Sequence, residues 1–261
     1  MKLKFILIIL FYFPFNIFAE TETIFLNYQP RIPFFIEDKK EKYPIDGTIY
    51  KIVQSIFQGL DIEYKYSNVP VIRTLQMIKE NKVKVCYPLG LRNLEREKIA
   101  LISKPIYKDK NTIVLYNIDN EKIKSYSNFT EMLKDKNITL LVKIGYSYGK
   151  LIDEKLHEYF HYKASEENKN IGKNINRTSD DNIGMLNQIL NKKSDYMLIA
   201  KNEIENLIEQ NAVYKKYLKI IEFKDLPEGE YRHLICSKKV GEEVMEKINS
   251  RIKILKLPNE K

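Results

Sequence analysis

Residues 70–107 read PVIRTLQMIKENKVKVCYPLGLRNLEREKIALISKPIY, and the rest of the chain is interpreted from the pattern of these residues. Apolar residues first recur at spacings of three and four, which predicts an amphipathic helix. They are Val71, Ile72, Leu75 and Ile78. Alternating residues over 83–87 then predict a short strand. Pro88 and Gly90 are expected to end that strand in a loop, from which Arg96 emerges and can point into a cleft.

The same stretch carries a family resemblance. Glu95-Arg96 and Ser103-Lys104-Pro105-Ile106-Tyr107 resemble the matching motifs of the bacterial extracellular solute-binding proteins of family 3. These are mostly the amino-acid-binding components of ABC importers. The family has Thr-Pro before Glu-Arg, and here Asn93-Leu94 replaces that pair. The resemblance implies an α/β, two-lobed periplasmic-binding-protein-like fold. Each lobe would be a mostly parallel sheet flanked by helices, joined to the other lobe by crossing hinge strands.

The rest of the chain alternates predicted strands and helices, which argues for helix-covered parallel sheets. A helix over 49–60 has one apolar face, is expected to end near Gly59, and lies between predicted strands at 23–28 and 61–66. With the resemblance, the order of elements gives four segments. These are a signal peptide at 1–19, the first part of lobe I at 20–112, lobe II at 113–223, and the return segment of lobe I at 224–261.

The first 19 residues have the pattern of a secretory signal. Lys2 and Lys4 precede an apolar run over 5–15, which is too short to span a bilayer, and Ala19 offers a small residue for cleavage. This predicts a periplasmic protein released from its signal. The alternative is an N-terminal anchor helix that is not cleaved.

The charge pattern bears on partners. The formal net charge is +9, and lysines alternate with acidic residues instead of gathering in one patch. Nucleic-acid binding is therefore not expected, because it needs a basic patch or stripe. The pattern favours a solvated lysine-rich surface, while attraction to an anionic envelope or to acidic ligands stays open.

The two cysteines, Cys86 and Cys236, each fall in a predicted strand. Disulfides persist in exported proteins, and an even count permits one bridge. In the resembled fold both strands belong to the same lobe, which makes a bridge plausible. The alternative is that both are small buried apolar side chains.

Arg96 is the first candidate ligand contact, because a guanidinium presents two parallel donors that match a carboxylate. The alternative is a surface arginine that pairs with Glu95 or Glu97. Arg92 is a second basic candidate from the same loop. The resemblance also implies apolar walls for the ligand, from Tyr28, Phe34, Tyr87 and Tyr148.

Lobe II offers a second set of candidates. Gly145 to Gly149 form a Gly/Ser loop between a predicted strand and a helix, and such a loop exposes N–H groups, as at Ser147, that suit an anion. In the family, an acidic residue before a later helix pairs with the ligand ammonium, and Asp180 or Asp181 matches it. The alternative is helix capping, with Ser179 or Asp180 as the N-cap.

His157 and His161 are four residues apart and could share a metal, but no third ligand is apparent, so surface histidines are preferred. No cofactor is expected.

The expected function is capture of an amino acid or other small carboxylate by a monomeric, non-enzymatic protein that delivers it to an ABC permease. Leu89-Gly90-Leu91 replaces the hydroxyl side chains that amino-acid binders often have, which points to a more apolar or larger acid, or a peptide fragment. One alternative is an enzyme resembling the cyclohexadienyl dehydratases, although no motif singles out its general acid. Another is a sensory ligand-binding module.

Overall fold

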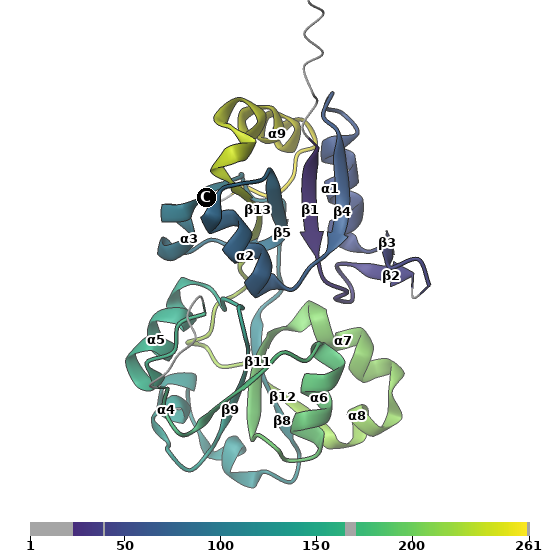
Figure 1. The fold of residues 1–261 in the computed structure, drawn as a ribbon. Helices are drawn as coiled ribbons and strands as arrows, with labels where there is room; N and C mark the ends of the chain where they lie inside the picture. Colours follow the sequence, from purple (N-terminus) through teal and green to yellow (C-terminus); the bar gives the residue numbers. More distant parts are fainter. Residues whose placement is uncertain (1–22, 39, 165–170, 260–261) are drawn as a thin grey trace, which may run out of the picture.

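The computed structural model describes residues 23–38, 40–164 and 171–259. The predicted signal peptide at 1–19 lies outside these residues. Figure 1 shows two lobes, one above the other, with the chain crossing between them. In the described residues, no helix combines the length and the apolar character that a bilayer span requires.

Lobe I is built on a six-stranded sheet in the order β4-β1-β5-β13-β6, with β7 also paired to β13. The strands are β1 (Ile24–Tyr28), β4 (Tyr64–Asn68), β5 (Val85–Leu91), β6 (Ala100–Ile102), β7 (Tyr107–Lys108) and β13 (Tyr231–Ser237). Strands β4, β1 and β5 are parallel, whereas β13 runs antiparallel to β5, β6 and β7. The helices of this lobe are α1 (Thr48–Phe57), α2 (Val71–Glu80), α3 (Leu94–Ile99) and α9 (Glu242–Ile254), with a 3-10 turn, η2 (Lys238–Val240), before α9. A hairpin of β2 (Ile36–Asp38) and β3 (Tyr43–Asp46) projects from its side.

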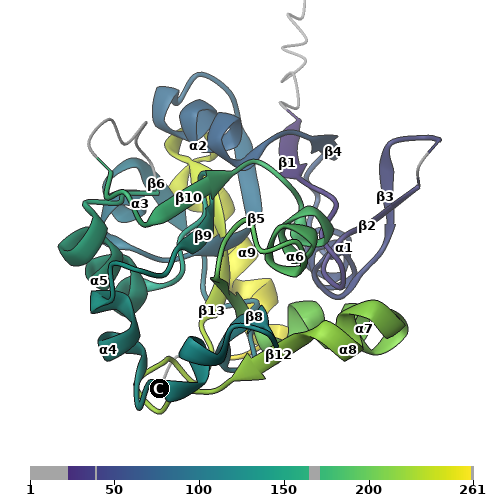
Figure 2. The same cartoon turned by 90° about the horizontal axis from the view of Figure 1, so that it is seen from below.

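Lobe II has a five-stranded sheet in the order β10-β9-β11-β8-β12. Its strands are β8 (Thr112–Asn117), β9 (Leu140–Lys143), β10 (Ile175–Thr178), β11 (Tyr196–Ala200) and β12 (Leu218–Ile221). Its helices are η1 (Glu121–Ser125), α4 (Phe129–Lys134), α5 (Lys150–Phe160), α6 (Asn182–Leu190), α7 (Lys201–Gln210) and α8 (Ala212–Tyr217). Helices α4 and α5 cover one face of this sheet, and α6, α7 and α8 cover the other (Figure 2).

Alternation along the strands produces the two cores of lobe II. On β8, Val114 and Tyr116 pack with the α4–α5 side, while Ile113 and Leu115 pack with the α6–α8 side. Successive side chains of a strand point to opposite faces, so a strand covered on both sides is apolar over most of its length. The expected α/β, two-lobed architecture is confirmed, and antiparallel strands complete each sheet.

The expected end of β5 at Pro88 and Gly90 is wrong, because the strand continues, fully buried, to Leu91. Between Cys86 and Leu91, β5 has one residue more than the facing part of β13, and the register shifts between His233 and Ile235. Pro88 thus sits in a bulge, where a missing N–H donor is tolerated. Gly90 is needed because a Cβ there would lie 2.2 Å from Ile235 Cδ1.

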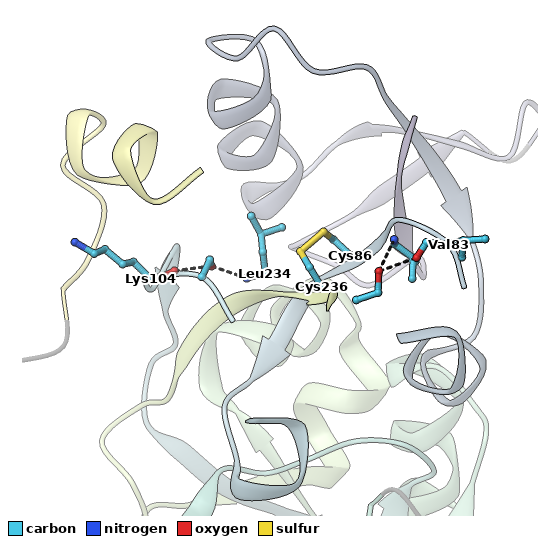
Figure 3. The surroundings of a disulfide bond; sticks show 8 residues. Val83, Cys86, Lys104, Leu234 and Cys236 are labelled. Carbon is cyan, nitrogen blue, oxygen red and sulfur yellow. Dashed lines mark hydrogen bonds between the residues drawn. A yellow bond between two sulfur atoms is a disulfide. The ribbon is translucent and has the colours of Figure 1, made fainter. Parts of the chain in front are cut away.

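Cys86 and Cys236 form a disulfide between β5 and β13, at directly paired positions (Figure 3). Of the two alternatives for these cysteines, the bridge is therefore the one found. Hydrogen bonds flank it on both sides, since Ser237 donates to Val83 O (2.7 Å) and Leu234 N donates to Ser103 Oγ (3.0 Å). The bridge therefore fastens the return segment of the chain to the strand before α3.

The structure also differs from two smaller expectations of the sequence analysis. Helix α1 ends at Phe57 with Gln58 as its C-cap, one residue before the expected Gly59. Arg96 lies on the short helix α3, capped by Asn93, instead of in an open loop.

Candidate functional site

The carboxyl ends of parallel strands in the two lobes face each other. In lobe I, β1 leads into the loop with Arg31, and in lobe II, β9 ends at Lys143 and β11 leads into α7 with Glu203. Open α/β sheets bind ligands at this edge. A cavity of about 40 Å³ lies here, lined by Arg31, Leu91 and Arg232 of lobe I and by residues of lobe II. That volume holds no more than a few water molecules, so the two lobes are closed on each other.

Arg31 and Glu203 join the lobes across this cavity. Arg31 Nε donates to Glu203 Oε2 (2.5 Å) and Arg31 Nη2 donates to Glu203 Oε1 (2.7 Å). Both side chains are buried, so the pair is shielded from solvent. A bidentate guanidinium–carboxylate contact is the strongest kind of charge-assisted hydrogen bond available to side chains.

Arg232 extends the pair into a network. It donates to Asp109 Oδ2 (2.8 Å from Nε), to Glu203 Oε1 (3.0 Å) and to the carbonyl of Leu89 (3.1 Å). Burial would raise the pKa of Glu203, but Arg31 and Arg232 outweigh it and hold the pKa below its usual value. Burial raises the pKa of Asp109, and Arg232 only partly offsets this.

Aromatic rings cover the arginines. The Arg31 guanidinium lies 4.4 Å from the Tyr146 ring centroid, and Arg31 and Arg232 lie 5.7 and 5.1 Å from the Phe34 ring. Tyr87 is buried beside them, and burial together with Tyr146 raises its pKa to about 12. Such rings exclude water and contribute cation–π attraction.

Lys143 is the last residue of β9 and is only 5 % exposed. Its ammonium lies 4.7 Å from the Tyr146 ring. Among the described residues it forms no ion pair with a carboxylate. Burial, followed by repulsion from Arg31, lowers the pKa of Lys143 to about 8.

Arg96, the first predicted contact, is buried, with 5 % of its surface exposed, and it does not line the cavity. Its Nη1 donates to Leu91 O (2.7 Å), and its Nη2 donates across the lobes to Gly145 O (3.3 Å). The surface pairing considered as an alternative is therefore not what the structure has. Burial lowers the pKa of Arg96, although the nearby Tyr87 and Asp153 act to raise it.

The predicted anion-binding loop of lobe II already holds a carboxylate. Asp153 accepts from Ser147 Oγ (2.5 Å) and from the backbone N–H of Tyr148 (2.8 Å). Ser147 and Tyr148 both line the cavity. The loop therefore presents its donors to a side chain of α5.

The other predicted residues lie away from the cavity. Tyr28 is in the core of lobe I and donates to Glu37 (2.7 Å), and Arg92 is exposed and bonded to Glu97 (2.6 Å). Asp181 caps α6 by accepting from Gly184 N (2.8 Å). The helix-capping alternative thus describes its contact, although the cap is Asp181 and not Ser179 or Asp180.

The charged network itself was missed from the sequence. Its members are Arg31, Asp109, Glu203 and Arg232, and Lys143 lines the same cavity without an ion pair to them. Each is one charge among many in a chain with 44 basic and 35 acidic residues. The available signal was positional, since Lys143 ends one largely buried strand and Arg31 follows another, at the edge where such sheets bind ligands.

Comparison with known proteins places the fold. No family model matches the chain, and no curated protein matches it. An ancestral arginine-binding protein bound to arginine superposes with a TM-score of 0.65 and 15 % identity, over 90 % of this chain and 92 % of its own. The arginine-, lysine-, histidine-binding protein ArtJ of Geobacillus stearothermophilus gives 0.66 and 14 %, over 90 % and 89 %.

A structure from work on glutathione import through GshT and the cystine ABC importer TcyBC of Streptococcus mutans gives a TM-score of 0.68 and 16 % identity, over 90 % of this chain and 89 % of its own. Another match is the substrate-binding protein of an amino acid ABC transporter, with a TM-score of 0.64. The chain therefore has the fold of the substrate-binding proteins of amino-acid ABC transporters, as the resemblance implied.

Proposed function

We propose that this protein is a solute-binding protein, which encloses an amino acid or other small carboxylate between its lobes and delivers it to an ABC permease. The observation that carries the proposal is the charged cavity lined from both lobes at the carboxyl ends of their strands. Closure of two lobes around a ligand is how such folds bind. Matching structures of proteins that bind arginine, lysine and histidine, together with one from work on glutathione import, support the same class of solute.

Arg96 is the proposed contact for the solute carboxylate. It is buried beside the cavity-lining residue Leu91, and its described hydrogen bonds go only to main-chain carbonyls. One of those carbonyls, Gly145 O, belongs to the opposite lobe, so opening of the cleft frees that N–H for a ligand. A guanidinium–carboxylate pair would be a stronger contact than the one it replaces.

The proposal also covers the cellular location of the protein and the permease it serves. The signal-like residues 1–19 direct the chain to the periplasm, where a monomer would meet an inner-membrane permease. The lobe boundaries at 20–112, 113–223 and 224–261 are part of the same proposal. A non-enzymatic role is favoured because the matching structures cited above are binding proteins.

The test is a thermal-shift screen of the mature chain, residues 20–261, against amino acids, small organic acids and glutathione. We expect at least one solute to raise the Tm, and Arg96→Ala to abolish that rise. Arg73→Ala is the matched control, because Arg73 is an exposed arginine of lobe I. A screen without any shift would reject the proposed function. Turnover of prephenate or arogenate by the purified protein would favour the dehydratase instead.

A further inference from the structure

Lys143 is a buried lysine without a described ion pair. A buried ammonium normally has a carboxylate partner, because an isolated buried charge is costly. Lys143 is 95 % buried and lines the interlobe cavity, and its ammonium lies against the Tyr146 ring. Asp181, Glu203 and Asp180 act on it from a distance, but none of them forms a described ion pair with it. The cavity wall thus holds one cation that the described part of the chain does not neutralise by an ion pair.

The other charges lining the cavity are accounted for. Arg31 and Arg232 are neutralised by Glu203 and Asp109 through hydrogen bonds of 2.5–3.0 Å. Glu230 also lines the cavity, but it forms no described ion pair with Lys143, and burial, Asp153 and Asp109 raise its pKa. The lobe II side of the cavity therefore holds a lysine whose ammonium has no described ion pair.

We propose that Lys143 binds an acidic group of the solute, so that the protein selects a small solute with an acid function beyond the carboxylate assigned to Arg96. This rests on the proposed function and narrows its substrate class to acidic amino acids and their analogues. Asp109 Oδ1, which is buried and lacks a described donor, is suited to accept from the ammonium group of such an amino acid.

The proposed solute differs in charge from the solutes of several structures that this chain resembles. Several of those bind arginine, a cationic amino acid. A guanidinium-bearing side chain brought into this cleft would meet Lys143 in a water-poor site, where like charges repel most strongly. An acidic side chain would gain a charge-assisted hydrogen bond in the same place.

The experiment measures Kd by calorimetry for two acid–amide pairs, L-glutamate with L-glutamine and L-aspartate with L-asparagine, and for L-arginine. In each pair the shape is nearly constant and only the charge changes. We expect the acid of at least one pair to bind at least tenfold more tightly than its amide and than arginine. Lys143→Met should raise that Kd on the order of ten- to a hundredfold, and Lys143→Arg should largely preserve it. Lys193→Met, at an exposed lysine of lobe II, is the control and should change nothing.

Two results would overturn the proposal while leaving a solute-binding role intact. One is tighter binding of an amide or of arginine than of either acid by the unmodified protein, which needs no variant to fold. The other is an unchanged Kd for the acid in Lys143→Met. Binding of none of the five probes would also overturn it, and the wider thermal-shift screen then decides whether the proposed function fails as well.

Discussion

Arg31 and Glu203 stand 172 residues apart in the chain, yet their side chains form a bidentate ion pair that spans the two lobes. Arg31 follows β1 of lobe I, and Glu203 is in the first turn of α7 in lobe II. The closed arrangement is thus held by the protein's own charges as well as by any solute it encloses. A solute must therefore compete with, or be added to, an existing contact between the lobes.

Replacing Glu203 by Gln should weaken closure. The change leaves Arg31 buried without a full charge partner, and breaking a buried pair in this way costs about 3–5 kcal/mol. We expect lower stability in urea and a larger radius of gyration by small-angle scattering. Glu222→Gln is the control, because its pair with Lys201 is half-exposed and such pairs contribute about 0–1 kcal/mol. Equal effects of the two substitutions would refute the role of Arg31–Glu203.

Lys143 should make the ligand-free protein more stable in mild alkali. Its pKa is lowered from 10.5 to about 8, so between these values the unfolded chain binds more protons than the folded one. The free energy of unfolding therefore rises with pH across that window. Below about pH 8 the buried, charged Lys143 lowers the free energy of unfolding by its full amount, roughly 3 kcal/mol. Arg31, Glu203, Asp180 and Asp181 also act on Lys143.

The measurement is urea unfolding at pH 7 and pH 9.5 for the unmodified protein and for Lys143→Met. Tyrosines and other lysines titrate in both, so the difference between the proteins isolates Lys143. We expect the variant to be more stable at pH 7 and its advantage to shrink at pH 9.5. A constant difference at both pH values would contradict the expectation. If Lys143→Met loses binding of the acidic solute but gains stability, Lys143 serves ligand binding and not folding.

Gly90→Ala should be costly. The new Cβ would lie 2.2 Å from Ile235 Cδ1 in the core of lobe I, and overpacking of a core costs about 1–3 kcal/mol. In an Ile235→Ala background the clash is removed, so Gly90→Ala should cost far less there. Chemical denaturation of all four proteins gives the coupling energy of this double-mutant cycle. Additive effects would show that Ile235 is not the obstacle.

The disulfide should stabilise the whole chain. Replacing Cys86 and Cys236 by Ser is expected to lower the free energy of unfolding by about 2–5 kcal/mol, since the bridge closes a long loop. Reductant should lower the Tm of the unmodified protein toward that of the double variant and leave the double variant unchanged. Equal Tm values for the oxidised protein and the double variant would refute this contribution.

Local sequence patterns predict an element correctly where interactions between nearby residues determine it. The apolar spacing from Val71 to Ile78 predicts a helix, and α2 spans Val71–Glu80. The end of β5 was not predictable in this way, because Pro88 is accommodated by a bulge against β13, which comes much later in the chain. The pairing partner, and not the proline alone, decides whether the strand continues.

The candidate site was harder to predict for a related reason. Glu203 and Arg232 look like any other charged residues of a helix and a strand, and only the folded chain brings them within hydrogen-bond distance. Arg96 was singled out by a motif, which identifies the residue but not its partners. Its hydrogen bonds to Leu91 O and Gly145 O depend on how the lobes meet.

Cys86 and Cys236 enclose every strand of lobe II, because β8 begins at Thr112 and β12 ends at Ile221. A protease that cuts once within this interval leaves two fragments tied through sulfur. Such a nicked molecule would migrate as one band on a non-reducing gel and as two after reduction. The second lobe can thus be cut without separation of the two fragments.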